Sequence, residues 1–491
     1  MTSSTRPNIV LLMTDQQRAG LTAGEGGPDT MPRLDALLAG GVRFDRAYTS
    51  SPACVPARTS LLTGRFPSAH HVRQNSTGRL AHYATDLLDL LRSAGYALHF
   101  SGKPHMHPQA EDFDSFHGPF LHDGGPQAGE QHVAFDTWLS ELDHSVSAEP
   151  TPFPVESQLP YRIVDGAIDA VADEGDQPFF LWLSFPEPHN PYQVPEPYFS
   201  MFDEAEVPER HAGPEVLDRL SWRYRWLHQL IEEKRPGYDQ EWRRYRANYL
   251  GMLRLIDDQI GRLLDHLGER AENTVFLFVS DHGDYFGDYG LQRKGAGMPD
   301  ALMRIPLAIS GPGIRSQHRS ELVSMVDLLP TIAEWLDQPI PAGVQGRSLA
   351  PLLQGLEAPA TEFGSILGEA GYGGVSYTEH DRPPLHFPYE GPTFDELNSV
   401  TQSGELRMIV EGRFKLIVDD RGEDVLYDLT ADPGETENLS HDPVYREVRE
   451  ALYRRLVQWL MRAADDLPEG HYTPNVRAHN WRWARIHQEH G

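Results

Sequence analysis

The only cysteine of the chain, Cys54, lies in a segment where a thiol could take part in chemistry. Pro56 follows two residues later and favours the first turn of a helix. Cys54 would then lie at a helix N-terminus, where free N–H groups and the helix dipole favour an anion, and Arg58 would add positive charge one turn later. A lone cysteine is also compatible with a small buried hydrophobic residue. The cationic setting favours a reactive group.

Two other segments could supply ligands for a metal ion. Asp15 follows one short apolar run, and the pair Asp281 and His282 follows another. These groups, brought together, would repel one another and stay hydrated unless they shared a divalent cation. Either segment alone is equally well explained by caps at strand-to-loop junctions. Together with Cys54 they predict a divalent metal site.

The elements that must position these residues are short apolar strands alternating with helices. Strands are predicted at residues 8–13, 97–101, 179–185, 275–280 and 305–310. Helices are predicted at 86–92, with Thr85 as N-cap, and over an amphipathic stripe at 249–267. Nearly continuous apolar strands between helices predict an α/β fold in which helices sandwich one large mixed sheet.

Polar side chains follow four of these strands. Ligands of such sheets bind beyond the carboxyl ends of the strands, so these side chains should meet at one edge. In strand order they are Asp15, then Lys103 and His105, then His189, then Asp281 with His282.

The pattern changes after about residue 375. Short strands at 406–410, 413–418 and 424–428, joined by turn residues, predict an antiparallel meander, and a helix is predicted at 444–460. We therefore expect a catalytic α/β domain at 1–375 and a smaller C-terminal α+β subdomain at 376–464. The tail at 465–491 shows no hydrophobic period that indicates a helix or strand. The sequence leaves open whether this tail docks on a neighbouring surface or is solvated.

Composition excludes several classes of protein. In 491 residues, 43 Lys and Arg against 72 Asp and Glu give a net charge of -29, which repels nucleic acid and anionic membranes. The longest apolar runs are far shorter than the ~20 residues that cross a bilayer, and the N-terminus has no secretory signal pattern. We expect a cytoplasmic protein. A single cysteine also excludes an intramolecular disulfide and a multi-cysteine zinc site.

These motifs resemble those of the type I sulfatases of the alkaline phosphatase superfamily. Cys54-Val55-Pro56-Ala57-Arg58 matches the C-x-P-x-R signature, whose cysteine is oxidised after translation to formylglycine. The match continues in the family order through 61–65, 102–105, 188–191, 280–283 with Lys294, 412–416 and 426–429 with 438–439. It covers nearly the whole chain apart from the tail.

The resemblance implies hydrolysis of sulfate esters to an alcohol and inorganic sulfate. Hydrated formylglycine at Cys54 would attack sulfur and then expel sulfate through its second hydroxyl group. The implied metal ligands are Asp15, Cys54, Asp281 and His282, and the metal would acidify the diol and neutralise the sulfuryl oxygens. The implied partners are a small-molecule or carbohydrate sulfate ester and a formylglycine-generating maturation enzyme. Whether the protein forms a homo-oligomer is left open.

The resemblance also implies roles for the remaining polar residues, although each could be an ordinary loop residue. Arg58, Lys103, His105 and Lys294 would complete a positive cradle for the sulfuryl group. His105 would be the base, and His189 or Lys294 the acid. The implied substrate-binding residues are Gln16 and Asn75.

Two positions depart from the common family pattern. Gln16 stands where many members have a second acidic residue, and His282 stands where many have Asn. Ca²⁺ is the expected ion. Mn²⁺ and Zn²⁺ are the alternatives, because an imidazole nitrogen suits them better. Similar pairs occur in relatives that hydrolyse phosphonate and phosphate esters. The alternatives are therefore a phosphonate monoester or phosphodiester hydrolase, and a non-catalytic metal-binding protein, but Lys103 and His105 favour sulfate esters.

Overall fold

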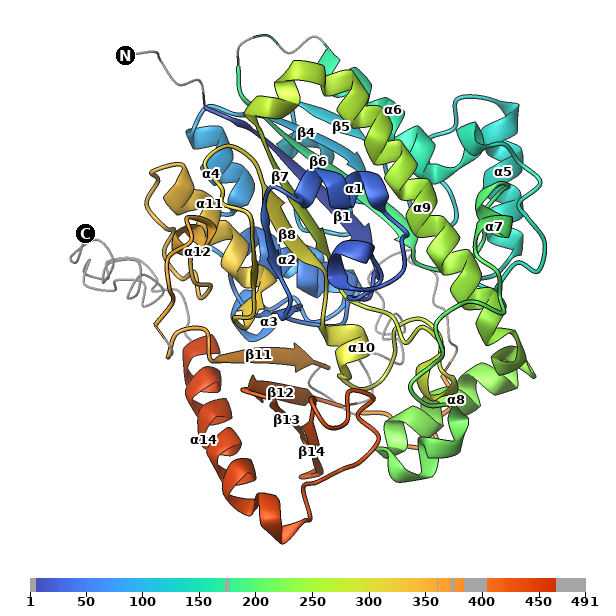
Figure 1. The fold of residues 1–491 in the computed structure, drawn as a ribbon, viewed down its shortest axis with the longest axis vertical. Coiled ribbons are helices and arrows are strands. Elements are labelled where there is room, and N and C mark those ends of the chain that lie inside the picture. The colour runs from blue at the N-terminus through green and yellow to red at the C-terminus, as the bar shows by residue number, and fades with distance from the viewer. Residues whose placement is uncertain are drawn as a thin grey trace.

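The computed structural model describes residues 6–172, 175, 177–359, 361–371, 376–383 and 404–464. The tail predicted at 465–491 lies outside these residues. Within them, an eight-stranded mixed sheet has the order β5-β4-β6-β1-β7-β8-β2-β9 (Figure 1). Its strands are β1 (Asn8–Asp15), β2 (Val42–Phe44), β4 (Ala97–Gly102), β5 (Ser115–His117), β6 (Phe179–Pro188), β7 (Thr274–Ser280), β8 (Leu307–Ser310) and β9 (Gln317–Arg319). β3 (Ala47–Tyr48) and β10 (Val323–Ser324) form a separate two-stranded parallel sheet.

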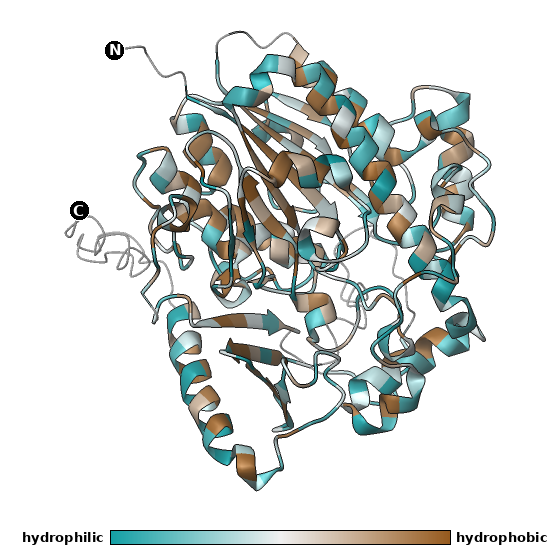
Figure 2. Cartoon of the chain, in the orientation of Figure 1, coloured by the Kyte–Doolittle hydropathy of each residue, from teal (hydrophilic) through white to brown (hydrophobic). Residues whose placement is uncertain are grey.

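The central strand β1 is apolar throughout because both of its faces are buried. Ile9, Leu11 and Met13 pack into one hydrophobic core, and Val10 and Leu12 pack into a second core on the other face. Successive side chains of a strand point to opposite faces, so a strand covered on both sides cannot alternate with polar residues. Figure 2 shows the same hydrophobic colouring along the strands of this sheet. The predicted α/β sandwich is confirmed.

Helices cover both faces of this sheet. One core contains residues of α2 (Cys54–Thr63), α4 (Leu87–Ser93), α11 (Leu328–Trp335) and α12 (Ala350–Leu353). The other core contains residues of α1 (Pro32–Leu38), α6 (Leu159–Ala172) and α9 (Trp242–Leu267), and α9 crosses the sheet as the longest of the described helices (Figure 1). The remaining helices of the large part are α3 (Pro67–His70), α5 (Glu130–Glu141), α7 (Tyr198–Met201), α8 (Trp222–Lys234) and α10 (Asp300–Met303). None of the described helices is both long and apolar enough to span a membrane.

Several predicted boundaries differ from those in the structure, and three of them have a clear physical reason. The N-cap of α4 is Asp86 rather than Thr85, because the Asp86 carboxylate accepts the backbone N–H of Asp89 at 2.9 Å. β6 continues to Pro188, past the predicted end at 185, because it stays paired with β1. α9 begins at Trp242 rather than at 249, since buried Tyr245 extends the apolar stripe toward the N-terminus.

The second sheet is antiparallel, and both of its faces are covered by packed side chains. It consists of β11 (Ser365–Ala370), β12 (Leu406–Glu411), β13 (Phe414–Asp419) and β14 (Asp424–Asp428), and α14 (Arg446–Ala463) follows it. One face packs against α14, and the other face packs against Tyr48 and Met303 of the large part. The antiparallel sheet predicted near the C-terminus is confirmed. Its strand β11 comes from before residue 375, and the division into domains stays a prediction.

Candidate active site

The register of β1 and β7 places two carboxylates side by side. The strands are parallel, Thr14 lies opposite Ser280, and the backbone N–H of Asp281 donates to the Thr14 carbonyl at 3.3 Å. Asp15 and Asp281 are therefore neighbours at the carboxyl edge of the sheet. This is the edge at which the sequence predicted that polar residues would meet.

Cys54 is the first residue of α2, as predicted, and its side chain is 1% exposed. Its Sγ atom lies 3.1 Å from Lys294 Nζ, 3.3 Å from His282 Nε2 and 3.8 Å from Asp15 Oδ1. Burial and the charge of Asp15 would raise the pKa of the thiol. The ammonium groups of Lys294 and Lys103 outweigh them, and the pKa of Cys54 falls below its ordinary value.

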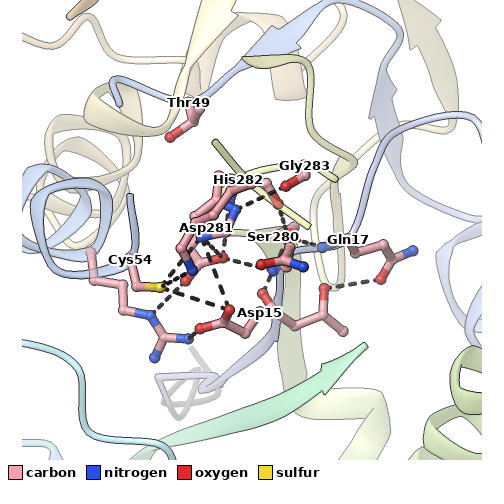
Figure 3. A network of polar contacts seen from close by, with 12 residues as sticks. Asp15, Gln17, Thr49, Cys54, Ser280, Asp281, His282 and Gly283 are labelled. Atoms are coloured by element: carbon pink, nitrogen blue, oxygen red, sulfur yellow. Dashed lines mark hydrogen bonds and ion pairs between the residues drawn. The ribbon is translucent and has the colours of Figure 1, made fainter. Parts of the chain in front are cut away.

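The four predicted metal ligands are gathered in one place (Figure 3). Asp15, Cys54, Asp281 and His282 each offer one ligand atom, and these atoms all lie within 4.8 Å of one another. His282 Nδ1 lies 2.9 Å from the Gly283 carbonyl oxygen, so Nδ1 carries the hydrogen and the Nε2 lone pair is left for a ligand. Carboxylate oxygens and one imidazole nitrogen are a donor set that fits a divalent cation.

Arg58 holds both carboxylates at once. Its guanidinium donates from Nε to Asp281 Oδ2 at 2.9 Å and from Nη2 to Asp15 Oδ2 at 3.0 Å. Its Nη1 donates to the Lys103 carbonyl at 2.9 Å and to Ser184 Oγ at 2.7 Å. Because Arg58 takes the Oδ2 atoms, Asp15 keeps its Oδ1 atom turned toward the Cys54 sulfur. A buried guanidinium in this fork fixes the orientation of both predicted ligands.

Lys103 is also an ion-pair partner of Asp15. Its Nζ lies 2.8 Å from Asp15 Oδ2, and both side chains are fully buried. Burial would raise the pKa of Asp15, but Lys103 and Arg58 outweigh it and hold that pKa well below its usual range. Asp15 is therefore a carboxylate at any pH near neutrality.

Two of the three predicted proton-transfer residues, His105 and His189, are neutral imidazoles. Burial, followed by the charges of Lys103 and Arg58, holds the pKa of His105 well below its ordinary value. Burial, followed by Lys294 and Lys103, does the same to His189. His189 Nδ1 lies 2.8 Å from the Asn190 carbonyl oxygen. The carbonyl can only accept, so Nδ1 carries the hydrogen and Nε2 is the atom that can take up a proton.

Gln16 and Asn75 are each only partly engaged. Gln16 Nε2 donates to Asp284 Oδ2 at 2.5 Å, and Asn75 Oδ1 accepts the Val55 N–H at 3.1 Å, which caps α2 just after Cys54. Gln16 Oε1 and Asn75 Nδ2 are buried without a hydrogen-bond partner among the described residues. Their role in substrate binding stays a prediction. Gln16 Oε1 and Asn75 Nδ2 are the atoms that would make the hydrogen bonds to a substrate.

The sequence did not identify two further groups near these residues. Asp284 anchors Gln16 and also accepts the hydroxyls of Tyr192, at 3.0 Å, and Tyr245. Its position three residues after Asp281 was an available signal. His122 has its ring centroid 5.3 Å from that of His189 and 4.4 Å from that of His144. Both histidines lie in loops or at helix ends, where no periodicity indicated their placement.

Known proteins resemble this chain over most of its length. The family model described as Sulfatase matches residues 7–338. An arylsulfatase of Clostridium perfringens (strain 13 / Type A) is 30% identical, over 93% of this chain and 94% of its own. A choline-sulfatase of Rhizobium meliloti (strain 1021) is 27% identical, over 89% and 83% of the two chains. The crystal structure of the phosphonate monoester hydrolase of Agrobacterium radiobacter has the same fold, with a TM-score of 0.73 at 22% identity over 93% and 96% of the chains.

Proposed function

The chain belongs to the sulfatase family and is a sulfuric ester hydrolase, and we propose that Cys54 provides its nucleophile after oxidation to formylglycine. The observation that carries this proposal is the position of Cys54. It begins a buried helix, 3.1 Å from the Lys294 ammonium, and it shares a cluster with Asp15, Asp281 and His282.

The Sγ atom of Cys54 stands for one oxygen of the modified residue. Hydrated formylglycine supplies one hydroxyl that attacks sulfur and a second hydroxyl whose deprotonation expels sulfate. Lys294 lies close enough to this position to favour a deprotonated oxygen by its charge, as it favours the thiolate.

Asp15, Asp281 and His282 would hold a divalent metal ion beside Cys54. Such an ion supplies Lewis acidity toward the nucleophile and the sulfuryl oxygens. We propose Ca²⁺ because two of the three other donors are carboxylates, with Mn²⁺ or Zn²⁺ as the alternatives that the imidazole would suit. Metal analysis of the purified protein decides among them.

The positive groups of the site explain how a strongly acidic chain binds an anion. The chain carries a net charge of -29, yet Arg58, Lys103 and Lys294 gather around Cys54. Charges fixed in a buried site stabilise the charge that develops on a transferred sulfuryl group. The local field is therefore opposite in sign to that of the whole molecule.

His105 and His189 would move the protons of the reaction. A neutral imidazole can accept a proton, so His105 is proposed as the base toward the nucleophile. His189 is proposed as the acid toward the leaving oxygen, acting through Nε2 because Nδ1 is bonded to the Asn190 carbonyl. Lys294 is the alternative acid.

The substrate is proposed to be a small-molecule or carbohydrate sulfate ester. The proposal requires a formylglycine-generating maturation enzyme as a partner. A location in the cytoplasm stays a prediction from the sequence.

A phosphonate monoester or phosphodiester hydrolase is the second candidate. It is favoured by His282, which adds a nitrogen ligand, and by Gln16, which replaces an acidic group next to Asp15. Against it, the buried Lys103 ammonium stands beside Asp15 in the segment that matches the sulfatase form.

Kinetics on fully converted enzyme separate the two candidates. We expect kcat/KM for 4-nitrophenyl sulfate to exceed that for the matching phenylphosphonate and phosphate diester. A clear preference for either phosphorus ester would establish the second candidate instead. Peptide mass mapping must show formylglycine at Cys54, and an active enzyme in which Cys54 is entirely a thiol would contradict the proposed nucleophile.

A further inference from the structure

Glu187, near the end of β6, is a buried carboxyl group that the reaction described above does not use. It is 5% exposed, and its Oε2 atom has no hydrogen-bond partner among the residues that the structure describes. Buried polar atoms without partners are rare in folded proteins and cost free energy. Burial raises the pKa of Glu187 to about 8, so the group is a carboxylic acid near neutral pH.

Glu187 shares a small cavity with two imidazoles. Glu187, His122 and His189 line a space of about 10 Å³, together with Gln193 and neighbouring apolar side chains. A space of this size has room for about one water molecule. The ring centroids of His122 and His189 lie 5.3 Å apart. The Glu187 carboxyl group and the His189 ring therefore border the same water-sized space.

The positive charges of Lys294 and Lys103 oppose protonation of His189, and the carboxyl of Glu187 offsets this cost. To act as an acid, His189 must first become an imidazolium, but burial and the charges of Lys294 and Lys103 oppose this. A proton taken from solvent would add a further positive charge to the site. A proton taken from Glu187 leaves the pair of groups neutral overall, and Lys103 and Arg162 favour the resulting carboxylate.

We propose that Glu187 is a positioning residue that supplies, across this cavity, the proton that His189 gives to the leaving oxygen. The O–H bond of Glu187 breaks as an N–H bond forms on the imidazole. That N–H bond then breaks as the leaving oxygen separates from sulfur and takes the proton. The Glu187 carboxylate regains a proton from water after the alcohol has left. The inference rests on the proposed sulfatase function and on His189 as its acid.

The first test is the variant Glu187→Gln, which keeps the size of the side chain but cannot ionise. Phenyl sulfate has a poor leaving group that needs an acid, whereas 4-nitrophenyl sulfate needs little help. We expect kcat to fall ~10-fold or more for phenyl sulfate and to stay within about twofold for 4-nitrophenyl sulfate. The control is Glu141→Gln, which removes an exposed carboxyl at the end of α5 and should change neither rate.

The second test is the pH profile of kcat with phenyl sulfate. Glu187 faces His122 and His189 across the cavity and lies in the field of Lys103, Arg162 and Asp15. Wild-type activity should fall as the pH rises through about 8, because the carboxyl loses the proton that it must supply. This alkaline limb should be absent in Glu187→Gln.

A double variant shows whether Glu187 acts through His189. In a His189→Asn background, Glu187→Gln should cause no further loss, because the residue that it serves has gone. Equal losses for both aryl sulfates, or losses that multiply in the double variant, would show a merely structural role and overturn the proposal. An unchanged leaving-group dependence in Glu187→Gln would also overturn it. If the converted wild-type enzyme cleaves no aryl, choline or carbohydrate sulfate, the proposed function itself has failed.

Discussion

Where β1 and β7 end, the carboxylates of Asp15 and Asp281 are paired with cations, whereas at the end of β6 the polar groups are neutral. Arg58 bridges Asp15 and Asp281, and Lys103 adds a second cation on Asp15. At the end of β6, the rings of His122, His144 and His189 lie with centroids 4.4 to 6.4 Å apart, near the carboxyl of Glu187, whose Oε2 atom has no hydrogen-bond partner among the described residues.

The difference separates two tasks of the site. Buried ion pairs with several hydrogen bonds hold their atoms in one arrangement and keep their charges throughout the reaction. Neutral imidazoles and a protonated carboxyl carry no charge between turnovers, and each has an atom that can accept or give up a proton, so they can change charge during a turnover. We infer that the first region binds and polarises the sulfuryl group and that the second region handles protons at the leaving group.

The largest effect is expected from breaking the paired region. Asp281→Asn removes a proposed metal ligand and one of the two carboxylates on Arg58, so kcat should fall ~1000-fold or more and the metal content should drop. Circular dichroism checks that the variant is folded. Asp45→Asn, on an exposed carboxylate, is the control. Near-wild-type turnover at full metal content would remove Asp281 from the ligand set.

The next largest effect is expected at Lys294. Lys294→Met keeps most of the length of the side chain and removes the charge 3.1 Å from Cys54 Sγ, so kcat for 4-nitrophenyl sulfate should fall ~100-fold. In protein made without the maturation enzyme, the same change should raise the pKa of the Cys54 thiol. Lys234→Met, on the surface of α8, is the matched control. A thiol that titrates as in the wild type would show that Lys294 does not set the local field.

A smaller effect is expected in the neutral region. His122→Asn keeps a hydrogen-bonding group but removes one ring from the cluster, so kcat/KM for phenyl sulfate should fall ~10-fold or less. The loss for 4-nitrophenyl sulfate should be smaller still. His318→Asn, on an exposed ring, is the control. A loss as large as that of Lys294→Met would contradict the division into two regions.

The smallest effect concerns the free energy of unfolding. It comes from His70, a neutral imidazole that contacts α2, the helix that Cys54 begins. His70 lies 2.9 Å from Ser60 Oγ of α2 and accepts the Val72 N–H, and burial holds its pKa well below the ordinary value. Below about pH 6.5 the unfolded chain therefore binds more protons there, and stability falls by up to ~1.4 kcal/mol per pH unit.

Urea unfolding at several pH values checks this contribution. His70→Gln should be less stable than the wild type near neutral pH, because it loses a hydrogen bond, but its stability should fall less steeply on acidification. An equal slope in both proteins would mean that His70 is protonated in the folded state as easily as in the unfolded state.

Much of the charged region was predictable from the sequence, and little of the neutral region was. Apolar runs identified β1 and β7, the strand-end rule brought Asp15 and Asp281 together, and Pro56 indicated the start of α2 at Cys54. These inferences depend on local patterns and on a general property of parallel sheets.

The residues of the neutral region meet through contacts between separate segments of the chain. No local sequence pattern indicates such contacts. His122 and His144 reach His189 through the packing of separate loops. The pairing of β11 with β12 likewise joins segments on either side of the predicted boundary at 375. Loop conformation is set by tertiary packing, so sequence patterns alone did not place these residues.

The burial of α2 bears on the proposed oxidation of Cys54. Cys54 is 1% exposed and all ten residues of its helix are buried. On the proposed mechanism, a modifying enzyme would reach this cysteine only while the segment is unfolded, so the proposed oxidation would compete with folding. A chain that folds first would keep its thiol. The active fraction of a preparation would then depend on the relative rates of oxidation and folding during synthesis. Slower folding would increase this fraction, and later incubation of the folded protein with the modifying enzyme would leave it unchanged.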